Sequence, residues 1–143
     1  MSDVNHADRA HALLSASGAD RWINCPPSAR LEEKQQQSGS SVFAREGTLA
    51  HELTDMTLRY ELGQLDKKIF NAELRRVKAD KLYSDEMPDE VQKFVDVCIE
   101  SYNTALAEFG DAEALIEERL DYSHIVEKGF GTGDFGVASD KTA

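Results

Sequence analysis

The sequence predicts a mixed α+β fold in which helices come first and a β-hairpin follows. Apolar residues recur at spacings of three and four in residues 44–62 and 88–109, which is the period of an amphipathic helix. After Gly110 the pattern changes to dense apolar and β-branched residues in ALIEERLDYSHIV, residues 114–126. The segment FGTGDFGVA at residues 130–138 then reads as a second strand, which we expect to pair antiparallel with the first across an EKG turn.

The chain length of 143 residues fits one domain, because 41% of the residues are hydrophobic and can form a core. Residues 1–10 are polar and lack an apolar period, so we expect a disordered arm there and a single domain over residues 11–143. No stretch approaches the roughly 18 consecutive apolar residues of a membrane span. We therefore expect a cytoplasmic protein that contacts no membrane and keeps Cys25 and Cys98 as reduced thiols.

Acidic residues are concentrated in the second half of the chain. The formal net charge at pH 7 is −11, and residues 81–143 contribute −10 of it. A surface that binds a phosphate backbone by counterion release is locally basic. The charge therefore argues against direct nucleic-acid binding by the second half.

Two short helices are expected near the N-terminus. Ser15 or Ser17 can cap the first, which carries Trp22 and Ile23. The pair Pro26-Pro27 interrupts it, and a second short helix begins with Pro27 in its first turn. The stretch KQQQSGSS at residues 34–41 is expected to be a loop.

The central part of the chain predicts two long helices. Residues 44–62 have strong helix formers and end before Gly63, the expected position of a left-handed cap. Their apolar residues fall on two faces, so we expect this helix to be covered on both sides. Residues 88–109 form a one-faced amphipathic helix that stops at Gly110, and residues 71–83 suggest a short solvated helix between the two.

His51 stands out from the core pattern. It lies in EGTLAHEL, and Gly47 one turn earlier leaves space beside the ring on the same helical face. A lone helical histidine is more often a hydrogen-bonded core residue or a surface residue, and that alternative stays open. The pair His51-Glu52 is no zinc-protease motif, because the second histidine such a motif requires is replaced by Asp55.

Acids on the two predicted strands also stand out. Asp134 follows Gly131 and Gly133, where missing side chains let another group come close, and a carboxylate there suits a hard divalent cation. The alternative is a turn-forming aspartate in a glycine-rich hairpin. Glu117 and Glu118 must point to opposite faces of the first strand, and both could equally be solvated acids on an edge strand. The sequence contains no P-loop, dinucleotide fingerprint or nucleophile elbow.

Three segments, in this order, resemble the RecB-like branch of the PD-(D/E)XK nuclease superfamily, and within it a phage and prophage family that carries a domain of formerly unknown function. They are LSASGADRWINCPPSARLEE at residues 14–33, AREGTLAHEL at 44–53 and LIEERLDYSHIVEKGFGTGDFGV at 115–137. The third is the most specific, because it combines an acid-bearing strand, a short loop and a GTGD strand. The resemblance implies a helix packed on a strongly bent sheet around one divalent ion, Mg²⁺ or Mn²⁺.

The resemblance also implies roles for particular residues. His51 and Asp134 correspond to metal ligands, and Asp134 and Glu117 to the catalytic acids, with Glu117 preferred to Glu118. Cys25 lies in the family's opening serine, tryptophan and cysteine-proline pattern, which is structural in most members. An iron–sulfur cluster, which some relatives hold near this position, is not expected, because Cys98 lies on a core stripe and cannot replace the missing ligands.

The sequence departs from the family at the third strand, which carries an acid, one residue and a lysine. The lysine orients the attacking water and stabilises charge on the phosphate. After Asp134 the lysine that remains is Lys141, and Ser139 stands where the acid is required. We therefore expect an incomplete restriction-endonuclease-like core: the N-terminal fragment of a phage-type DNA nuclease, truncated and inactive as it stands.

The alternative is an acidic, non-enzymatic phage or prophage accessory protein. Such a protein would bind a phage recombination or replication protein through the helix at residues 88–109 or through the unpaired edge of its strands. The net charge of −10 over residues 81–143 favours this alternative over direct DNA binding by that half.

Overall fold

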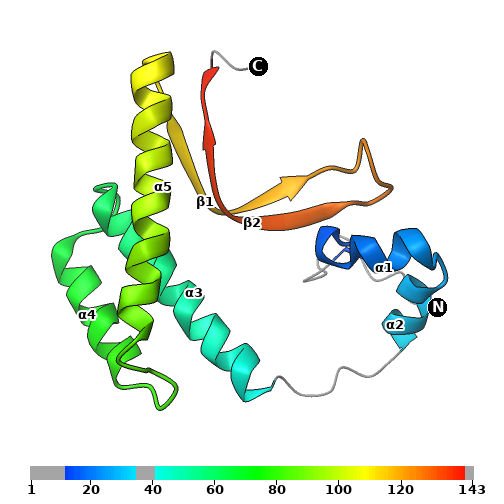
Figure 1. Ribbon diagram of the computed structural model, residues 1–143, viewed down its shortest axis with the longest axis horizontal. Helices are drawn as coiled ribbons and strands as arrows, with labels where there is room; N and C mark the ends of the chain where they lie inside the picture. Colours follow the sequence, from blue (N-terminus) through cyan, green and yellow to red (C-terminus); the bar gives the residue numbers. More distant parts are fainter. Residues whose placement is uncertain (1–11, 35–40, 141–143) are drawn as a thin grey trace. The chain divides into compact units, whose positions relative to one another are not determined.

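The computed structural model describes residues 12–34 and 41–140 (Figure 1). Within these ranges the chain forms a 3₁₀ helix, five α-helices and a two-stranded antiparallel sheet, which confirms the predicted α+β class. The described residues divide into two compact units. Unit 1 holds residues 12–34 and 117–134, and unit 2 holds residues 41–116 and 135–140. The predicted arm at residues 1–10 lies outside the described residues, and the single domain over 11–143 stays a prediction.

Unit 2 is built on three helices, in which α3 packs against both α4 and α5 (Figure 1). Their bounds are α3 Val42–Glu61, α4 Lys67–Lys78 and α5 Met87–Phe109. The predicted stops after the two long helices are confirmed, because Gly63 and Gly110 have φ angles of 71° and 81°. Glycine adopts this left-handed conformation without the strain that a side chain would cause. No helix within the described ranges is long and apolar enough to cross a bilayer.

The middle helix differs from its prediction. It begins at Lys67, four residues before the expected start, because Asp66 caps it: the Oδ1 atom accepts a hydrogen bond of 2.7 Å from the Lys68 amide. It also has an apolar face, since Val77 is fully buried and Phe70 packs against the core. The helix is therefore one wall of unit 2 and is solvated on its other side.

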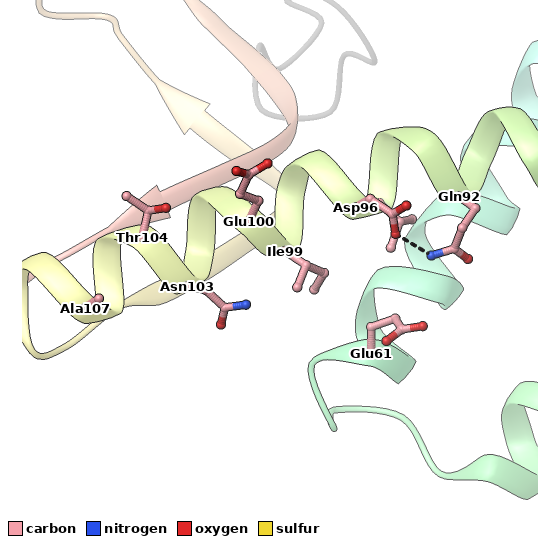
Figure 2. Close-up of a pocket in the computed structure, with 9 residues that line it drawn as sticks. Glu61, Gln92, Asp96, Ile99, Glu100, Asn103, Thr104 and Ala107 are labelled. Atoms are coloured by element: carbon pink, nitrogen blue, oxygen red, sulfur yellow. Dashed lines mark hydrogen bonds between the residues drawn. The ribbon is translucent and has the colours of Figure 1, made fainter.

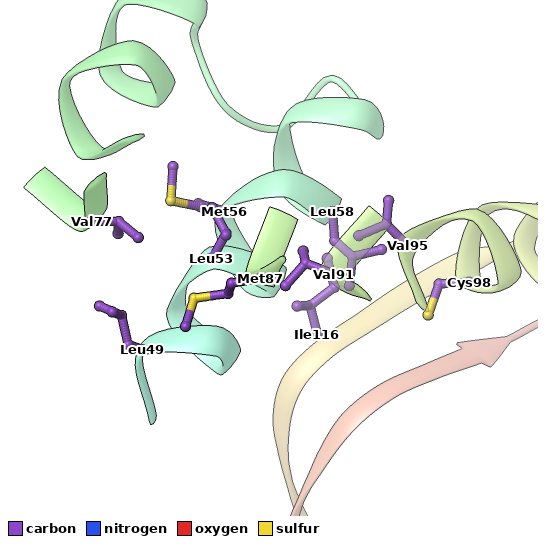
Figure 3. Packing of buried hydrophobic residues seen from close by; sticks show 10 residues of the cluster. All are labelled: Leu49, Leu53, Met56, Leu58, Val77, Met87, Val91, Val95, Cys98 and Ile116. Carbon is purple, nitrogen blue, oxygen red and sulfur yellow. The ribbon is translucent and has the colours of Figure 1, made fainter. Parts of the chain in front are cut away.

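The core of unit 2 lies between the three helices and the first strand (Figure 3). Its buried members are Leu49, Leu53, Met56, Leu58, Val77, Met87, Val91, Val95, Cys98 and Ile116. Burying one such aliphatic side chain stabilises the fold by about 1.5–3 kcal/mol. Leu58, on the second face of α3, is fully buried while His51 is exposed, so α3 is covered on both sides for only part of its length.

The hairpin consists of β1 (Glu113–Asp121) and β2 (Phe130–Ala138). β2 matches its prediction, but β1 ends at Asp121 and not near residue 126. The reason is the connection: the Tyr122 amide donates to the Gly129 carbonyl at 3.1 Å, which closes the loop. A Cβ atom at Gly129 would lie 2.5 Å from the Tyr122 ring, so glycine is required there.

Unit 1 is held by hydrogen bonds around short helices, whose bounds are η2 Ala16–Gly18, α1 Ala19–Asn24 and α2 Ser28–Lys34. Ser15, one of the two predicted caps, caps η2, because its Oγ accepts from the Gly18 amide at 3.2 Å. The helix that carries Trp22, α1, begins after Gly18 without a side-chain cap. The Trp22 Nε1 donates to the Ser15 carbonyl at 2.8 Å. The helix predicted to include Pro27 begins one residue later, and Pro27 contributes a carbonyl that accepts from the Leu31 amide. Most of the predicted loop at 34–41 lies outside the described residues.

Candidate metal centre

Glu117 on β1 and Asp134 on β2 lie opposite each other in the hairpin. The register is fixed at the loop by the Tyr122–Gly129 hydrogen bond. On the other side of Glu117 the same register holds, because a Cβ atom at Gly136 would lie 3.8 Å from the Leu115 Cβ. Residues directly opposite in an antiparallel pair have their Cβ atoms about 4.5–5.5 Å apart. The hairpin therefore brings together the two acids that the sequence singled out.

The two carboxylates are close enough to share a cation. Both side chains are exposed, and an oxygen of Glu117 lies within 4.8 Å of an oxygen of Asp134. Two anions at that separation repel by about 1 kcal/mol even in bulk water, and by more where water is partly excluded. Oxygens bound to one Mg²⁺ lie at most about 4.2 Å apart, since each Mg–O distance is 2.0–2.1 Å. A small side-chain rotation is enough to bring both acids onto one ion.

The backbone at Glu117 is strained. Its φ angle of 52° lies in the left-handed region, which non-glycine residues enter at a cost of about 1–3 kcal/mol. Glu118, the alternative acid of the same strand, is not among the residues with positive φ in the described part of the chain. Strain of this kind persists where the surrounding structure holds it, and it is frequent in ligand-binding sites. It sets Glu117 apart from its neighbour.

Asp134 lies in the middle of β2, so the alternative of a turn-forming aspartate is excluded. The two glycines before it lie against side chains of β1. A Cβ atom at Gly133 would lie 3.3 Å from the Leu120 Cδ1, which is closer than an ordinary contact, so the missing side chain makes room for Leu120. A Cβ atom at Gly131 would lie at an ordinary contact distance of 3.5 Å from the Tyr122 ring.

His51 is exposed on α3, in unit 2. The helix is fixed there by its buried residues Leu49 and Leu53, which lie on either side of His51 in the sequence. A Cβ atom at Gly47 would meet no described atom within 4 Å, so the predicted space one turn before the ring is open. The imidazole is presented to solvent and does not form part of the core.

A family model described as "Protein of unknown function (DUF2800)" matches residues 11–143. The chain belongs to the DUF2800 family. No solved structure matches the chain. The family description assigns no activity to this DUF2800 protein.

Sequence reasoning missed the left-handed backbone of Glu117. Glycine or asparagine would have signalled a positive φ, and glutamate does not.

The sequence did place Cys98 on the core stripe of α5, where the structure buries it. Burial raises the pKa of its thiol above the ordinary value. Cys25 is exposed in unit 1. Neither cysteine of the DUF2800 chain is needed for the acid pair.

Proposed function

We propose that this DUF2800 chain carries the metal-binding acids of a metal-dependent DNA nuclease of the RecB-like PD-(D/E)XK type, encoded by phage or prophage and acting in the bacterial cytoplasm. The observation that carries the proposal is the cross-strand pair of Glu117 and Asp134, with carboxylate oxygens within 4.8 Å. These are the two acids that the family resemblance assigns to catalysis. The proposed ion is Mg²⁺ or Mn²⁺, because carboxylate oxygens are the ligands these hard cations prefer.

His51 is the proposed third ligand. The assignment rests on the resemblance of the EGTLAHEL segment, in which His51 corresponds to a metal ligand. Within unit 2, the buried side chains of Leu49 and Leu53 fix α3 on either side of His51.

In the proposed mechanism Glu117 and Asp134 would hold the ion, which would supply Lewis-acid polarisation of the phosphate and an activated water. The His51 imidazole would be the third protein ligand. The 143 residues contain no acid-x-lysine after Asp134. We therefore expect this polypeptide to bind the metal ion without hydrolysing DNA at an appreciable rate, because the charge-stabilising lysine is absent from it.

Metal binding tests the site. Titration with Mn²⁺ is expected to show one site per chain whose affinity falls at least about tenfold in Glu117→Gln, in Asp134→Asn and in His51→Ala, as loss of one of three ligands implies. Glu118→Gln is the matched control, since it removes the same charge from the next residue of β1. Equal affinity in all four variants would refute the site.

Cleavage tests the reaction. The 143-residue polypeptide is incubated with linear single- and double-stranded DNA and Mn²⁺, beside a version that continues with whatever in-frame codons follow Ala143 in the gene. Cleavage that appears with an added acid-x-lysine segment and disappears in Asp134→Asn supports the proposal. Metal binding without cleavage in a version that carries such a segment would contradict it.

A second candidate function rests on a groove of about 570 Å³ along α5 in unit 2 (Figure 2). Its floor is apolar, with Val95 and Ile99, and its acidic side chains are Glu61, Asp96 and Glu100. This combination fits an amphipathic basic segment of a partner, such as a phage recombination or replication protein. The protein would then be a non-enzymatic accessory module.

Reversing the acidic charges of the groove on α5 distinguishes the two candidate functions. Asp96→Lys together with Glu100→Lys is expected to abolish capture of a basic phage partner, whereas Glu108→Lys, outside the groove on the same helix, leaves capture unchanged. Metal binding at Glu117 is independent of both changes. Capture that survives the double reversal would exclude the groove as the docking surface.

A further inference from the structure

One surface of unit 2 is basic, although the whole chain carries a net charge of −11. Residues 67–81 form α4 and the turn after it, and they hold six basic and two acidic side chains. All six basic side chains are exposed; they are Lys67, Lys68, Arg75, Arg76, Lys78 and Lys81. Positive charge is thus gathered on one short element of an acidic protein.

Four of these residues lie along one exposed flank of α4, beside the face that packs on the core. Lys67, Arg75 and Lys78 share one helical face with Asn71, because the spacings are four, four and three residues. Lys68 adjoins this face. We call Lys67, Lys68, Asn71, Arg75 and Lys78 the α4 stripe. At 1.5 Å per residue it extends over about 16 Å.

The cations of the stripe are not neutralised within the described part of the chain. Arg76, beside the stripe, donates to Glu73 and to Glu52 at 2.8 Å each, and these bonds raise the pKa of its guanidinium further. The ion pairs among described residues include none to Lys67, Lys68, Arg75 or Lys78. Like charges three or four residues apart on a helix destabilise it, and Arg75 and Lys78 are such a pair. No ion pair among the described residues relieves the repulsion between these two cations.

The helix dipole accounts for only half of the stripe. Arg75 and Lys78 lie in the last turn, where cations interact favourably with the negative end of the dipole. Lys67 and Lys68 lie in the first turn, where the dipole favours acids, and that turn contains no acid. The two lysines are unfavourable for the helix dipole, the Asp66 carboxylate at the N-cap offsets this in part, and an external anion would reduce the penalty further.

We propose that the α4 stripe binds the phosphate backbone of DNA and holds the substrate strand. The preference for an anion follows from the stripe alone, whereas the choice of DNA rests on the proposed nuclease function. A surface of four clustered cations releases counterions from DNA on binding, and its affinity falls with salt. Since the chain as a whole repels DNA, the stripe has to supply the attraction.

Fluorescence anisotropy with labelled single- and double-stranded DNA tests the proposal, with EDTA present so that no metal contributes. Two variants lose the same charge from exposed positions. The stripe variant is Lys67→Gln/Lys68→Gln/Lys78→Gln, and the control is Arg30→Gln/Lys93→Gln/Lys128→Gln. Helicity by circular dichroism verifies that both fold, and glutamine is a good helix former.

The stripe variant is expected to bind DNA about tenfold more weakly or worse at low salt. Its slope of log affinity against log salt is expected to shrink by about one for each lysine removed, while the control keeps the wild-type slope. Equal weakening in both variants, or none in either, would overturn the proposal. Displacement of DNA by polyglutamate at equal charge concentration would also overturn it, since the stripe would then bind any polyanion.

The outcome is separable from that of the proposed function. If the Glu117 and Asp134 variants keep the Mn²⁺ affinity while the stripe variant binds DNA more weakly, the nuclease assignment is refuted and DNA binding by the stripe is supported. If both acid variants lose Mn²⁺ affinity while the stripe variant binds DNA as the wild type does, DNA binding by the stripe is refuted and the metal centre is supported.

Discussion

Unit 1 and unit 2 are stabilised in different ways. Unit 2 buries ten apolar side chains in one core (Figure 3). Among the described residues of unit 1, the buried apolar side chains are those of Ala12 and Ala29, and hydrogen bonds join its segments. Tyr122 illustrates this, since its hydroxyl accepts from the Ala16 amide at 3.1 Å and donates to the Phe130 carbonyl at 2.9 Å.

This difference in stabilisation indicates which unit can hold a strained backbone in place. A net protein hydrogen bond contributes about 0.5–1.5 kcal/mol, and a buried aliphatic side chain about 1.5–3 kcal/mol. Unit 2 can therefore hold β1 at Ile116, whose carbonyl accepts from the Arg59 Nη2 at 3.3 Å. Glu117 follows directly and has the left-handed backbone. We expect unit 1 to open at lower denaturant concentration than unit 2.

The largest effect is expected in unit 2. Leu58→Ala removes a fully buried side chain from the core and should lower the free energy of unfolding by about 2–5 kcal/mol. Circular dichroism reports it, because the three long helices belong to unit 2. Trp22, the only tryptophan of the chain, reports unit 1 by fluorescence, and its midpoint should stay unchanged. Val97→Ala, at a side chain that is 60% exposed, is the control; an equal loss there would contradict the core assignment.

A smaller effect is expected at the loop of unit 1. Gly129→Ala puts a Cβ atom 2.5 Å from the Tyr122 ring and 2.8 Å from the Val126 carbonyl oxygen, so the loop must shift. The cost should be about 1–3 kcal/mol, seen as an earlier Trp22 transition with unchanged helicity. Gly136→Ala, with its nearest neighbour at 3.8 Å, is the matched control. A loss of helicity in Gly129→Ala would show that the units do not open separately.

The strain at Glu117 predicts an asymmetry between adjacent residues. Glu118→Gly should destabilise β1 by about 0.5–1 kcal/mol, the usual cost of glycine in a strand. Glu117→Gly should leave stability unchanged or raise it by up to about 1 kcal/mol, because relief of the left-handed backbone offsets that cost. Denaturant titration of both variants measures the difference. Equal destabilisation by both would mean that Glu117 is not strained.

The smallest effect concerns pH. The Asp121 carboxylate accepts a backbone hydrogen bond of 2.8 Å from Ser123, and this bond lowers its pKa below the ordinary 3.8. A lowered folded-state pKa contributes stability that is present above about pH 4 and is lost as the pH falls below it. Asp121→Asn should therefore shift the Trp22 transition slightly at pH 7 and by less at pH 3. A shift of equal size at both pH values would contradict the assignment.

The helices and the second strand were predictable, because their signals are local. Gly63 and Gly110 marked the helix ends, and the segment FGTGDFGVA at residues 130–138 marked β2. The end of β1 was not predictable from the sequence, because it depends on the hydrogen bond between Tyr122 and Gly129 across the loop.

For the candidate site, the sequence predicted the acids and not their conformation. Asp134 was placed by the GTGD pattern, but the left-handed backbone of Glu117 has no signature in a glutamate. The basic face of α4 was also hidden, because Lys67 and Lys68 lie before the segment that was read as a helix. Only the fold showed which side of α4 faces the core.

The most direct test of the metal centre is paramagnetic broadening by substoichiometric Mn²⁺ in the amide spectrum of the isotope-labelled chain. The amide signals of Glu117 and Asp134 should disappear first, together with that of His51. Broadening that begins along the acidic groove at Asp96 and Glu100 would contradict the proposed centre, because it would show that the ion follows general acidity and not the cross-strand pair.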